Sequence, residues 1–314
     1  MRDEAPPPRE PTPALTRTTD GLQNERRALT VAQKLELVSR GLAAGPDSVE
    51  VASFVRGDLV PAMAGAAELT RALADDAAVR AAKARGVGFA ALVPNPKGFE
   101  AMHKANESAR VLDTVVVLVS CSESHSRANV NRSMGDALAA TLDVVRAARE
   151  RGYAVRAYAS LAFGCPFEGR VPEDVVEHVV REYRAAGADW MCLADTLGVA
   201  APEQVRSLVG RAVAAGFPLD RVALHLHDSH GRAHENVAAG LDAGVRSFDA
   251  AVGGCGGCNF IPGAAGNVSV EKVARVCAAR GVAHALDLAA LARANEWLAD
   301  ALGRRLEGRA EAVE

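Results

Sequence analysis

Short apolar or β-branched runs alternate with amphipathic stretches along nearly the whole chain of 314 residues. The runs predict strands, and the Ala-, Glu- and Arg-rich stretches between them predict helices. Strands are expected near Ala14–Thr18, Ser48–Ala52, Val87–Val93, Thr114–Val119, Ala154–Ser160, Asp189–Leu193, Val222–His227 and Arg246–Val252. Helices are expected between them, such as Val31–Leu42, Met134–Arg151, Pro172–Ala186 and Pro202–Ala215.

This alternation predicts repeated βα units, that is, parallel strands joined by right-handed crossovers. Eight such units close naturally into a (β/α)8 TIM barrel, and a doubly wound open sheet is the alternative that the pattern leaves. The stretch Leu286–Arg305 predicts additional C-terminal helix. Single α/β barrels commonly comprise about 250 residues. We therefore expect one domain over residues 13–314, preceded by a disordered tail, Met1–Thr12, that is rich in proline and charge.

Charge and composition exclude several classes of protein. The formal net charge of −3 provides no basic surface for nucleic acid and no polybasic patch for a membrane. No apolar run approaches the roughly 20 residues that cross a bilayer, and the first residues lack the apolar core of a secretory signal. The six cysteines do not form the two Cys-x-x-Cys pairs of a structural zinc site. A reduced, cytoplasmic setting is predicted.

Polar residues follow the predicted strands at the end where a barrel carries its active site. In a TIM barrel this is the carboxyl end of the strands and the loops just after them. The residues in these places are Asp20, Glu50, Ser122–Glu123, Asp195, His225, His227 and the loop Gly253–Asn267. Their shared position predicts one site at the carboxyl face of the barrel.

The seventh predicted strand ends in His225-Leu226-His227. Strand side chains alternate, so both imidazoles should point to one face. Such a pair can be two hydrogen-bonded core histidines or two ligands of one metal ion. Asp20 favours the ion, because the first strand of a closed eight-stranded ring lies next but one to the seventh. With an amide oxygen from Asn267, this set suits Mg²⁺ or Mn²⁺, whereas zinc would favour thiolates or three histidines.

Cys258 lies in a glycine-rich loop, Gly253–Asn267, with no evident structural partner. Glycines permit the backbone angles and mobility of a closing loop. This setting favours a reactive thiol over a structural one. Cys255, three residues earlier, could form a disulfide with Cys258 under oxidation and silence the protein.

Several longer motifs occur together in a set order. They are Asp20-Gly-Leu-Gln-Asn-Glu25, Ser53-Phe-Val55, Pro94-Asn-Pro-Lys-Gly-Phe-Glu100, Gly164-Cys-Pro-Phe-Glu-Gly169, Asp195-Thr-Leu-Gly-Val199, His225-Leu-His-Asp228 and Gly256-Gly-Cys-Asn-Phe260 with Gly266-Asn267. From about Leu15 to Arg304, the chain resembles the 3-hydroxy-3-methylglutaryl-CoA lyase family, within a wider superfamily of metal-dependent lyases and Claisen-condensing enzymes.

The resemblance implies a carbon–carbon lyase that needs Mg²⁺ or Mn²⁺ and cleaves a 3-hydroxyacyl-CoA. It assigns the metal to Asp20, His225, His227 and Asn267. It makes Cys258 the donor of a proton to the enolate carbon, and Glu50 and Asp195 supporting carboxylates of the catalytic site. Asp20 and His225 are the candidates for the base that takes the hydroxyl proton. A homodimer is the commonest default for such a protein.

One position departs from the family. Its lyases carry an arginine just before the aspartate that matches Asp20, and this chain has Thr19 there. A hydroxyl is a far weaker electrophile than a fixed guanidinium. Three alternatives stay open: a lyase for another substrate, a lyase that uses another cation (Arg26 or Arg56), and a metal-binding barrel with little activity. A Claisen-condensing transferase is the alternative enzyme, although the Cys258 loop is typical of the lyases.

Overall fold

The computed structural model describes residues 14–16, 21–25, 27–256 and 266–307. Thr19, Asp20 and Cys258 lie outside these residues, as do Met1–Thr12. The described part has eight strands: β1 (Ala14–Thr16), β2 (Ser48–Ser53), β3 (Gly88–Leu92), β4 (Thr114–Ser120), β5 (Ala154–Ser160), β6 (Trp190–Asp195), β7 (Val222–Leu226) and β8 (Ser247–Asp249). Every predicted strand is found, with ends that differ by a few residues.

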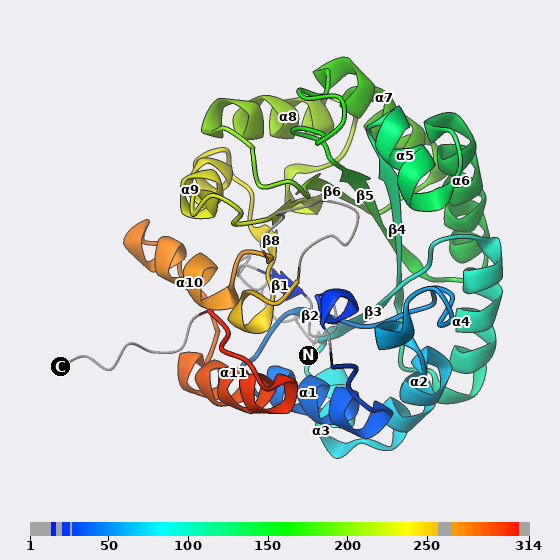
Figure 1. Cartoon of the computed structure of the whole chain (residues 1–314), viewed down its shortest axis with the longest axis vertical. Coiled ribbons are helices and arrows are strands. Elements are labelled where there is room, and N and C mark those ends of the chain that lie inside the picture. The colour runs from blue at the N-terminus through cyan, green and yellow to red at the C-terminus, as the bar shows by residue number, and fades with distance from the viewer. Residues whose placement is uncertain (1–13, 17–20, 26, 257–265, 308–314) are drawn as a thin grey trace, which may run out of the picture.

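The strands form one parallel sheet in the order β1-β8-β7-β6-β5-β4-β3-β2. β1 and β2, at the two ends of this order, contact each other, so the sheet curls into a barrel. Figure 1 shows the strands in the centre with the helices around them. The predicted (β/α)8 barrel is confirmed, and the open doubly wound sheet is excluded.

The helices cover the outside of the barrel. They are α1 (Val31–Ala43), α2 (Ala66–Asp75), α3 (Ala77–Ala84), α4 (Pro96–Ala109), α5 (Glu123–Val130), α6 (Met134–Glu150), α7 (Glu173–Ala186), α8 (Pro202–Ala214), α9 (Ala233–Asp242), α10 (Val270–Ala279) and α11 (Leu288–Leu302). Helix α11 is the predicted C-terminal addition, and it packs against α1 at the lower left of Figure 1.

Local chemistry sets several helix starts. The Thr30 side chain caps α1 by accepting from Gln33 N, and the Gln33 side chain accepts from Thr30 N. Ser269 caps α10 in the same way by accepting from Lys272 N. Such caps satisfy backbone N–H groups that have no partner inside the helix. The cap at Ser269 matters for the site, because α10 begins directly after the glycine-rich loop.

Two apolar layers hold the barrel together. The larger lies between the strands and the helices, where strand residues such as Val117, Val155 and Leu224 are fully buried. The smaller fills the inside of the barrel with Ala90, Val116, Tyr158, Cys192, Ala194 and Ala223. Alternate residues of each strand supply the two layers, as expected for strands buried on both faces.

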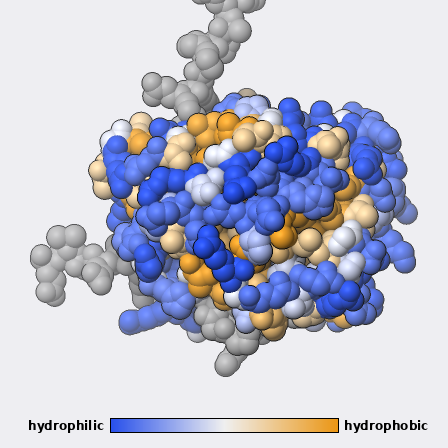
Figure 2. Space-filling view, turned by 90° about the horizontal axis from the view of Figure 1, so that it is seen from above, coloured by the Kyte–Doolittle hydropathy of each residue, from blue (hydrophilic) through white to orange (hydrophobic). Residues whose placement is uncertain are grey.

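The outer surface is mainly hydrophilic. Figure 2 shows separate hydrophobic patches among hydrophilic residues on the face that it presents. Large exposed apolar side chains come from different elements, for example Leu59, Phe167 and Leu288. None of the described helices is both long enough and apolar enough to cross a membrane.

Candidate metal centre and active site

The two histidines of the His-x-His motif lie at the carboxyl end of β7 and face each other. Both are buried, with 6% of His225 and 5% of His227 exposed. Their Nε2 atoms are 3.1 Å apart, and the ring centroids are 5.1 Å apart. The structure thus brings the two imidazoles together as strand alternation predicts.

Asn267 is placed beside His227 by backbone pairing. An antiparallel bridge joins the two residues, and Val268 N donates to Leu226 O at 2.8 Å. Asn267 is 2% exposed. The segment after the glycine-rich loop therefore runs along the end of β7 and delivers the predicted amide to the histidines.

A hydrogen bond sets the orientation of this amide. Asn267 Nδ2 donates to Cys255 O at 2.8 Å. Nδ2 is a hydrogen-bond donor and faces that carbonyl, whereas Oδ1 carries the lone pairs. Oδ1 is therefore the atom of the Asn267 side chain suited to bind a cation.

The described donors fit a divalent cation. Two imidazole nitrogens at 3.1 Å carry lone pairs that repel each other unless a proton or a cation lies between them. Imidazole and amide oxygen are both suitable ligands for a divalent metal. Among the described residues, no three His, Cys, Asp or Glu side chains form a metal cluster. The predicted carboxylate ligand, Asp20, lies outside those residues.

The first strand has the predicted place in the ring. β1 pairs with β8, and β8 pairs with β7. Thr16 is the register partner of Asp249, which in turn is the partner of His225. The strand that precedes Asp20 in the chain is therefore next but one to the histidine strand.

The carboxylate of Asp195 binds the turn that follows β6. Its Oδ1 accepts from Gly198 N and Val199 N, each at 3.0 Å, and its Oδ2 accepts from Ala200 N at 2.9 Å. Burial raises the pKa of Asp195, and these three hydrogen bonds act in the opposite direction. The geometry shows a side chain that organises the β6–α8 loop next to the histidines.

Glu50 is buried on β2, with 2% exposed. It pairs in register with Ala90, which faces the inside of the barrel. The register of β2 and β3 shifts directly after Glu50, since Ala52 pairs with Ala91. A bulge of this kind re-aims the neighbouring side chains, and bulges are common next to active sites.

A buried ion pair behind His225 was not predicted from the sequence. Arg156 Nη2 on β5 lies 2.7 Å from Asp249 Oδ1 on β8, and Asp249 is fully buried. The Tyr158 hydroxyl donates to Asp249 Oδ2. Burial alone would lower the pKa of Arg156, but the attraction of Asp249, together with Tyr158 and Cys192, outweighs it and the pKa lies above its ordinary value. Charged residues at inward positions of apolar strands were the available signal.

The Asp249 carboxylate of this ion pair also influences the tautomer of His225. His225 Nδ1 is 3.6 Å from Asp249 Oδ2, too far for a hydrogen bond but close enough for attraction. A carboxylate on this side of the ring favours the tautomer with hydrogen on Nδ1. The Nε2 lone pair of His225 is then available on the side that faces His227.

Four of the cysteines outside the Cys258 position are deeply buried in the described structure. Cys121, Cys192 and Cys277 are at most 3% exposed. Cys255 is buried to the same degree, and its burial, with Glu25 nearby, raises the pKa of its thiol to about 12. Cys255 is therefore a neutral thiol near pH 7.

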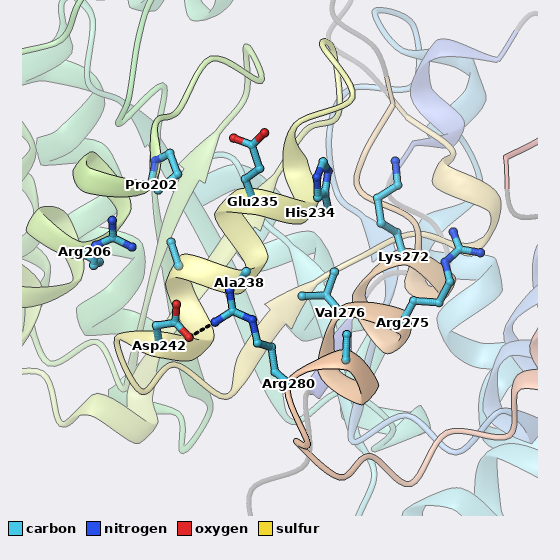
Figure 3. A pocket seen from close by; sticks show the side chains of 12 residues that line it. Pro202, Arg206, His234, Glu235, Ala238, Asp242, Lys272, Arg275, Val276 and Arg280 are labelled. Atoms are coloured by element: carbon cyan, nitrogen blue, oxygen red, sulfur yellow. Dashed lines mark hydrogen bonds and ion pairs between the residues drawn. The ribbon is translucent and has the colours of Figure 1, made fainter.

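A groove of about 650 Å³ lies among the outer helices α8, α9 and α10. Figure 3 shows Asp242 and Arg280 reaching toward each other across it. Lys272, on its edge, pairs with Asp228. The groove is thus an outer feature bounded by ion pairs and contains none of the predicted site residues.

Comparison with known proteins identifies the family. The HMGL-like family model matches residues 14–298. The chain is 40% identical over 291 residues to the 3-hydroxy-3-isohexenylglutaryl-CoA/hydroxy-methylglutaryl-CoA lyase of Pseudomonas aeruginosa, covering 93% of this chain and 92% of that protein. It is 37% identical to the (R)-citramalyl-CoA lyase of Chloroflexus aurantiacus, covering 91% of this chain and 89% of that protein.

A solved structure agrees with both relatives. The crystal structure of hydroxymethylglutaryl-CoA lyase from Pseudomonas aeruginosa superimposes with a TM-score of 0.86 at 36% identity, covering 96% of each chain. The family match spans nearly all of the described barrel, including β7 and the segment that carries Asn267. The chain therefore belongs to the HMGL-like family and is a carbon–carbon lyase.

Proposed function

We propose that this protein is a lyase dependent on Mg²⁺ or Mn²⁺ that cleaves 3-hydroxy-3-methylglutaryl-CoA, or a relative with a larger C3 substituent, to acetyl-CoA and a 3-oxo acid. The observation that carries the proposal is the convergence of His225, His227 and Asn267 at the carboxyl face of the barrel. The names of the curated relatives, all acyl-CoA lyases, support the substrate class.

In this proposal the residues of the chain divide the work. A divalent cation held by Asp20, His225, His227 and Asn267 would help the C3 hydroxyl to ionise near neutral pH. Asp20 takes the hydroxyl proton, because His225 with hydrogen on Nδ1 and Nε2 on the cation has no lone pair left, and the adjacent carbon–carbon bond then breaks. The electron pair of that bond collects as the thioester enolate, and Cys258 gives its proton to the enolate carbon. Cleavage thus yields the 3-oxo acid and acetyl-CoA.

The two other predicted carboxylates support this site. Asp195 holds the β6–α8 loop through three backbone N–H groups, so we propose that it positions rather than transfers protons. Glu50 lies buried on the inner face of β2, where it can orient a group at the barrel mouth.

Thr19 leaves open which group stabilises the enolate oxygen. Of the replacements suggested by the sequence, Arg56 lies on the surface, where its Nε donates to Asp58 Oδ1 at 3.1 Å. Arg26 lies outside the described residues, as does Arg17, a further cation two residues before Thr19 in the sequence. We propose that Arg56 is the weakest of these candidates, since a surface ion pair holds it.

A coupled assay tests the function. The purified protein is offered several 3-hydroxyacyl-CoAs, with and without Mg²⁺ or Mn²⁺, and formation of acetyl-CoA is followed. We expect cleavage only with metal. Condensation of acetyl-CoA with an oxo acid, without cleavage of any of the 3-hydroxyacyl-CoAs, would support the Claisen-type transferase instead. Metal binding without cleavage of any acyl-CoA would leave a metal-binding barrel of low activity.

The metal site makes a separate prediction. His227→Ala should lose most of the bound metal but keep the fold, because the apolar layers of the barrel do not depend on the ion. Metal content by atomic absorption and the circular dichroism spectrum check the two parts. His234→Ala, at an exposed position on α9, is the control and should keep its metal. Full activity of the parent protein after chelator treatment would contradict the proposed metal site.

We also propose a cytoplasmic location and a homodimer for this protein. Sedimentation of the purified protein would measure its oligomeric state.

A further inference from the structure

The two ends of the glycine-rich loop are joined to each other in the structure. The short helical turn η4 (Val252–Gly254) begins the loop, and Ser269 follows it. Ala251 N donates to Val268 O, and Val270 N donates to Ala251 O, each at 3.1 Å. A Cβ on Gly266 would lie 1.8 Å from Gly254 O, so only glycine permits this approach. The position of η4 and that of the segment with Asn267 are therefore coupled.

The coupling reaches the proposed metal ligand. Cys255, directly after η4, accepts the hydrogen bond that orients the Asn267 amide, at 2.8 Å. A shift of η4 would move this carbonyl and turn the amide. Whatever holds η4 thus also sets the direction of Asn267 Oδ1.

The turn η4 is held by residues of α10, of α11 and of the segment that follows α11. Gly253 has a left-handed backbone (φ 61°), and its carbonyl accepts from Glu307 N at 3.0 Å. The Glu271 carboxylate accepts from Asn295 Nδ2 at 3.2 Å, and a Cβ on Gly253 would lie 2.5 Å from Asn295 Oδ1, so Asn295 lies against η4. Asn295 Nδ2 also donates to Glu307 O at 2.8 Å. We call Gly253, Glu271, Asn295 and Glu307 the η4 clamp.

The position of the Glu271 carboxylate is energetically unfavourable. Burial raises the pKa of Glu271 to about 7, although its hydrogen bonds and the charge of Arg275 act against the rise. Its Oε2 has no hydrogen-bond partner in the described structure. A buried carboxylate without a close ion pair opposes folding, and groups of this kind concentrate at functional sites.

We infer that Glu271 is a positioning residue, which holds η4 through Asn295 and Glu307 and thereby keeps the Asn267 amide aimed at the metal. The inference rests on the proposed function, because it takes Asn267 as a metal ligand. Glu271 itself, on α10, acts through the side chain of Asn295.

The length of the side chain is the feature to test. Glu271→Gln keeps an acceptor oxygen at the same reach, whereas Glu271→Asp is one methylene shorter and Glu271→Ala has no acceptor. Glu296→Ala removes an exposed carboxylate from α11, beside Asn295, and is the matched control. If the Ala variant does not fold, the Asp variant carries the test.

Mn²⁺ affinity of the metal-free protein is the first measurement, read from the electron spin resonance of free Mn²⁺. Loss of a group that orients a metal ligand typically weakens binding by about 10–100-fold. We expect this loss in Glu271→Asp and Glu271→Ala, a change of at most about threefold in Glu271→Gln by the same reasoning, and none in Glu296→Ala. Parental affinity in the Asp and Ala variants, or equal loss in Gln and Ala, would overturn the inference.

Amide hydrogen exchange is the second measurement and needs no metal. Amides of residues 251–256 should exchange faster in the Asp and Ala variants than in the Gln variant. Unchanged exchange in this segment would also overturn the inference. Failure of the parent protein to bind Mn²⁺ would instead contradict the proposed metal site, and exchange would then still decide whether Glu271 holds η4.

Discussion

Replacement of Cys258 by Ala is expected to slow turnover by about 10²–10⁴-fold, the usual range for a lost general acid or base. The thiol is the group assigned to protonate the enolate carbon, and alanine has no proton to give. Metal affinity should stay close to that of the parent, because the proposed ligands are Asp20, His225, His227 and Asn267. Steady-state turnover of the acyl-CoA and Mn²⁺ binding, measured on the same preparation, separate the two effects.

Cys255→Ala is the matched control for this change. It lies three residues earlier in the same loop, is 3% exposed, and has a thiol whose pKa is raised to about 12. Such a thiol supplies almost no thiolate at neutral pH, so we expect its removal to leave turnover near the parental rate. If Cys258→Ala matches the parent, the proton donor is another group.

Oxidation gives a second test of the same thiol. The thiolate is the reactive form of cysteine, and the high pKa of Cys255 makes it a poor attacking group. A bridge between the two residues would therefore begin with oxidation or attack at Cys258. Reversible inhibition by oxidant that disappears in Cys255→Ser would demonstrate the bridge.

The fold was predictable because its signal is local and repeated. Each βα unit carries its own apolar run and amphipathic helix, so the eight strands and the C-terminal helix were found with small errors at their ends. The largest error falls at β8, expected over Arg246–Val252 and observed over Ser247–Asp249. There the chain leaves the sheet early to enter the turn η4.

The histidine pair was predictable for a similar reason. Alternation within a single strand places His225 and His227 on one face, and no knowledge of distant contacts is needed. The approach of Asn267 depends on a backbone bridge to His227 that forms only in the folded chain. Its place just after the eighth predicted strand suggested an amide ligand, and the family resemblance assigned it, but the bridge itself could not be predicted from spacing.

The buried network behind His225 was missed because its members are far apart in the sequence. Arg156 and Asp249 are on β5 and β8, and they meet only through the inside of the closed barrel. Asp195 illustrates another limit. The family resemblance implied a supporting carboxylate, but only the structure shows that its oxygens are bound to Gly198, Val199 and Ala200.

Thr19→Arg is expected to raise turnover of 3-hydroxy-3-methylglutaryl-CoA substantially, if no other cation replaces the arginine of the family. A fixed donor facing a developing oxyanion is worth roughly 10²–10³ in rate, or about 3–4 kcal/mol. Two described arginines that could supply this charge are already held in ion pairs. Arg56 binds Asp58 on the surface, and Arg156 binds Asp249 inside the barrel.

The effect should appear in turnover rather than in substrate affinity, because the negative charge on the thioester oxygen develops only as the carbon–carbon bond breaks. The comparison needs saturating metal, with kcat and KM reported separately. Thr19→Lys is the matched control. It adds the same charge without the planar fork of donors, and it should recover less activity than arginine.

The reverse outcome has a definite meaning. Full activity of the parent on this substrate, with no gain from Thr19→Arg, would show that another group stabilises the enolate. Arg17 and Arg26 would then be truncated first, and Arg56 last, since Asp58 holds Arg56 at the surface. If neither the parent nor Thr19→Arg cleaves any acyl-CoA, but both bind Mn²⁺ through the histidines, the metal site stands and the proposed substrate class does not.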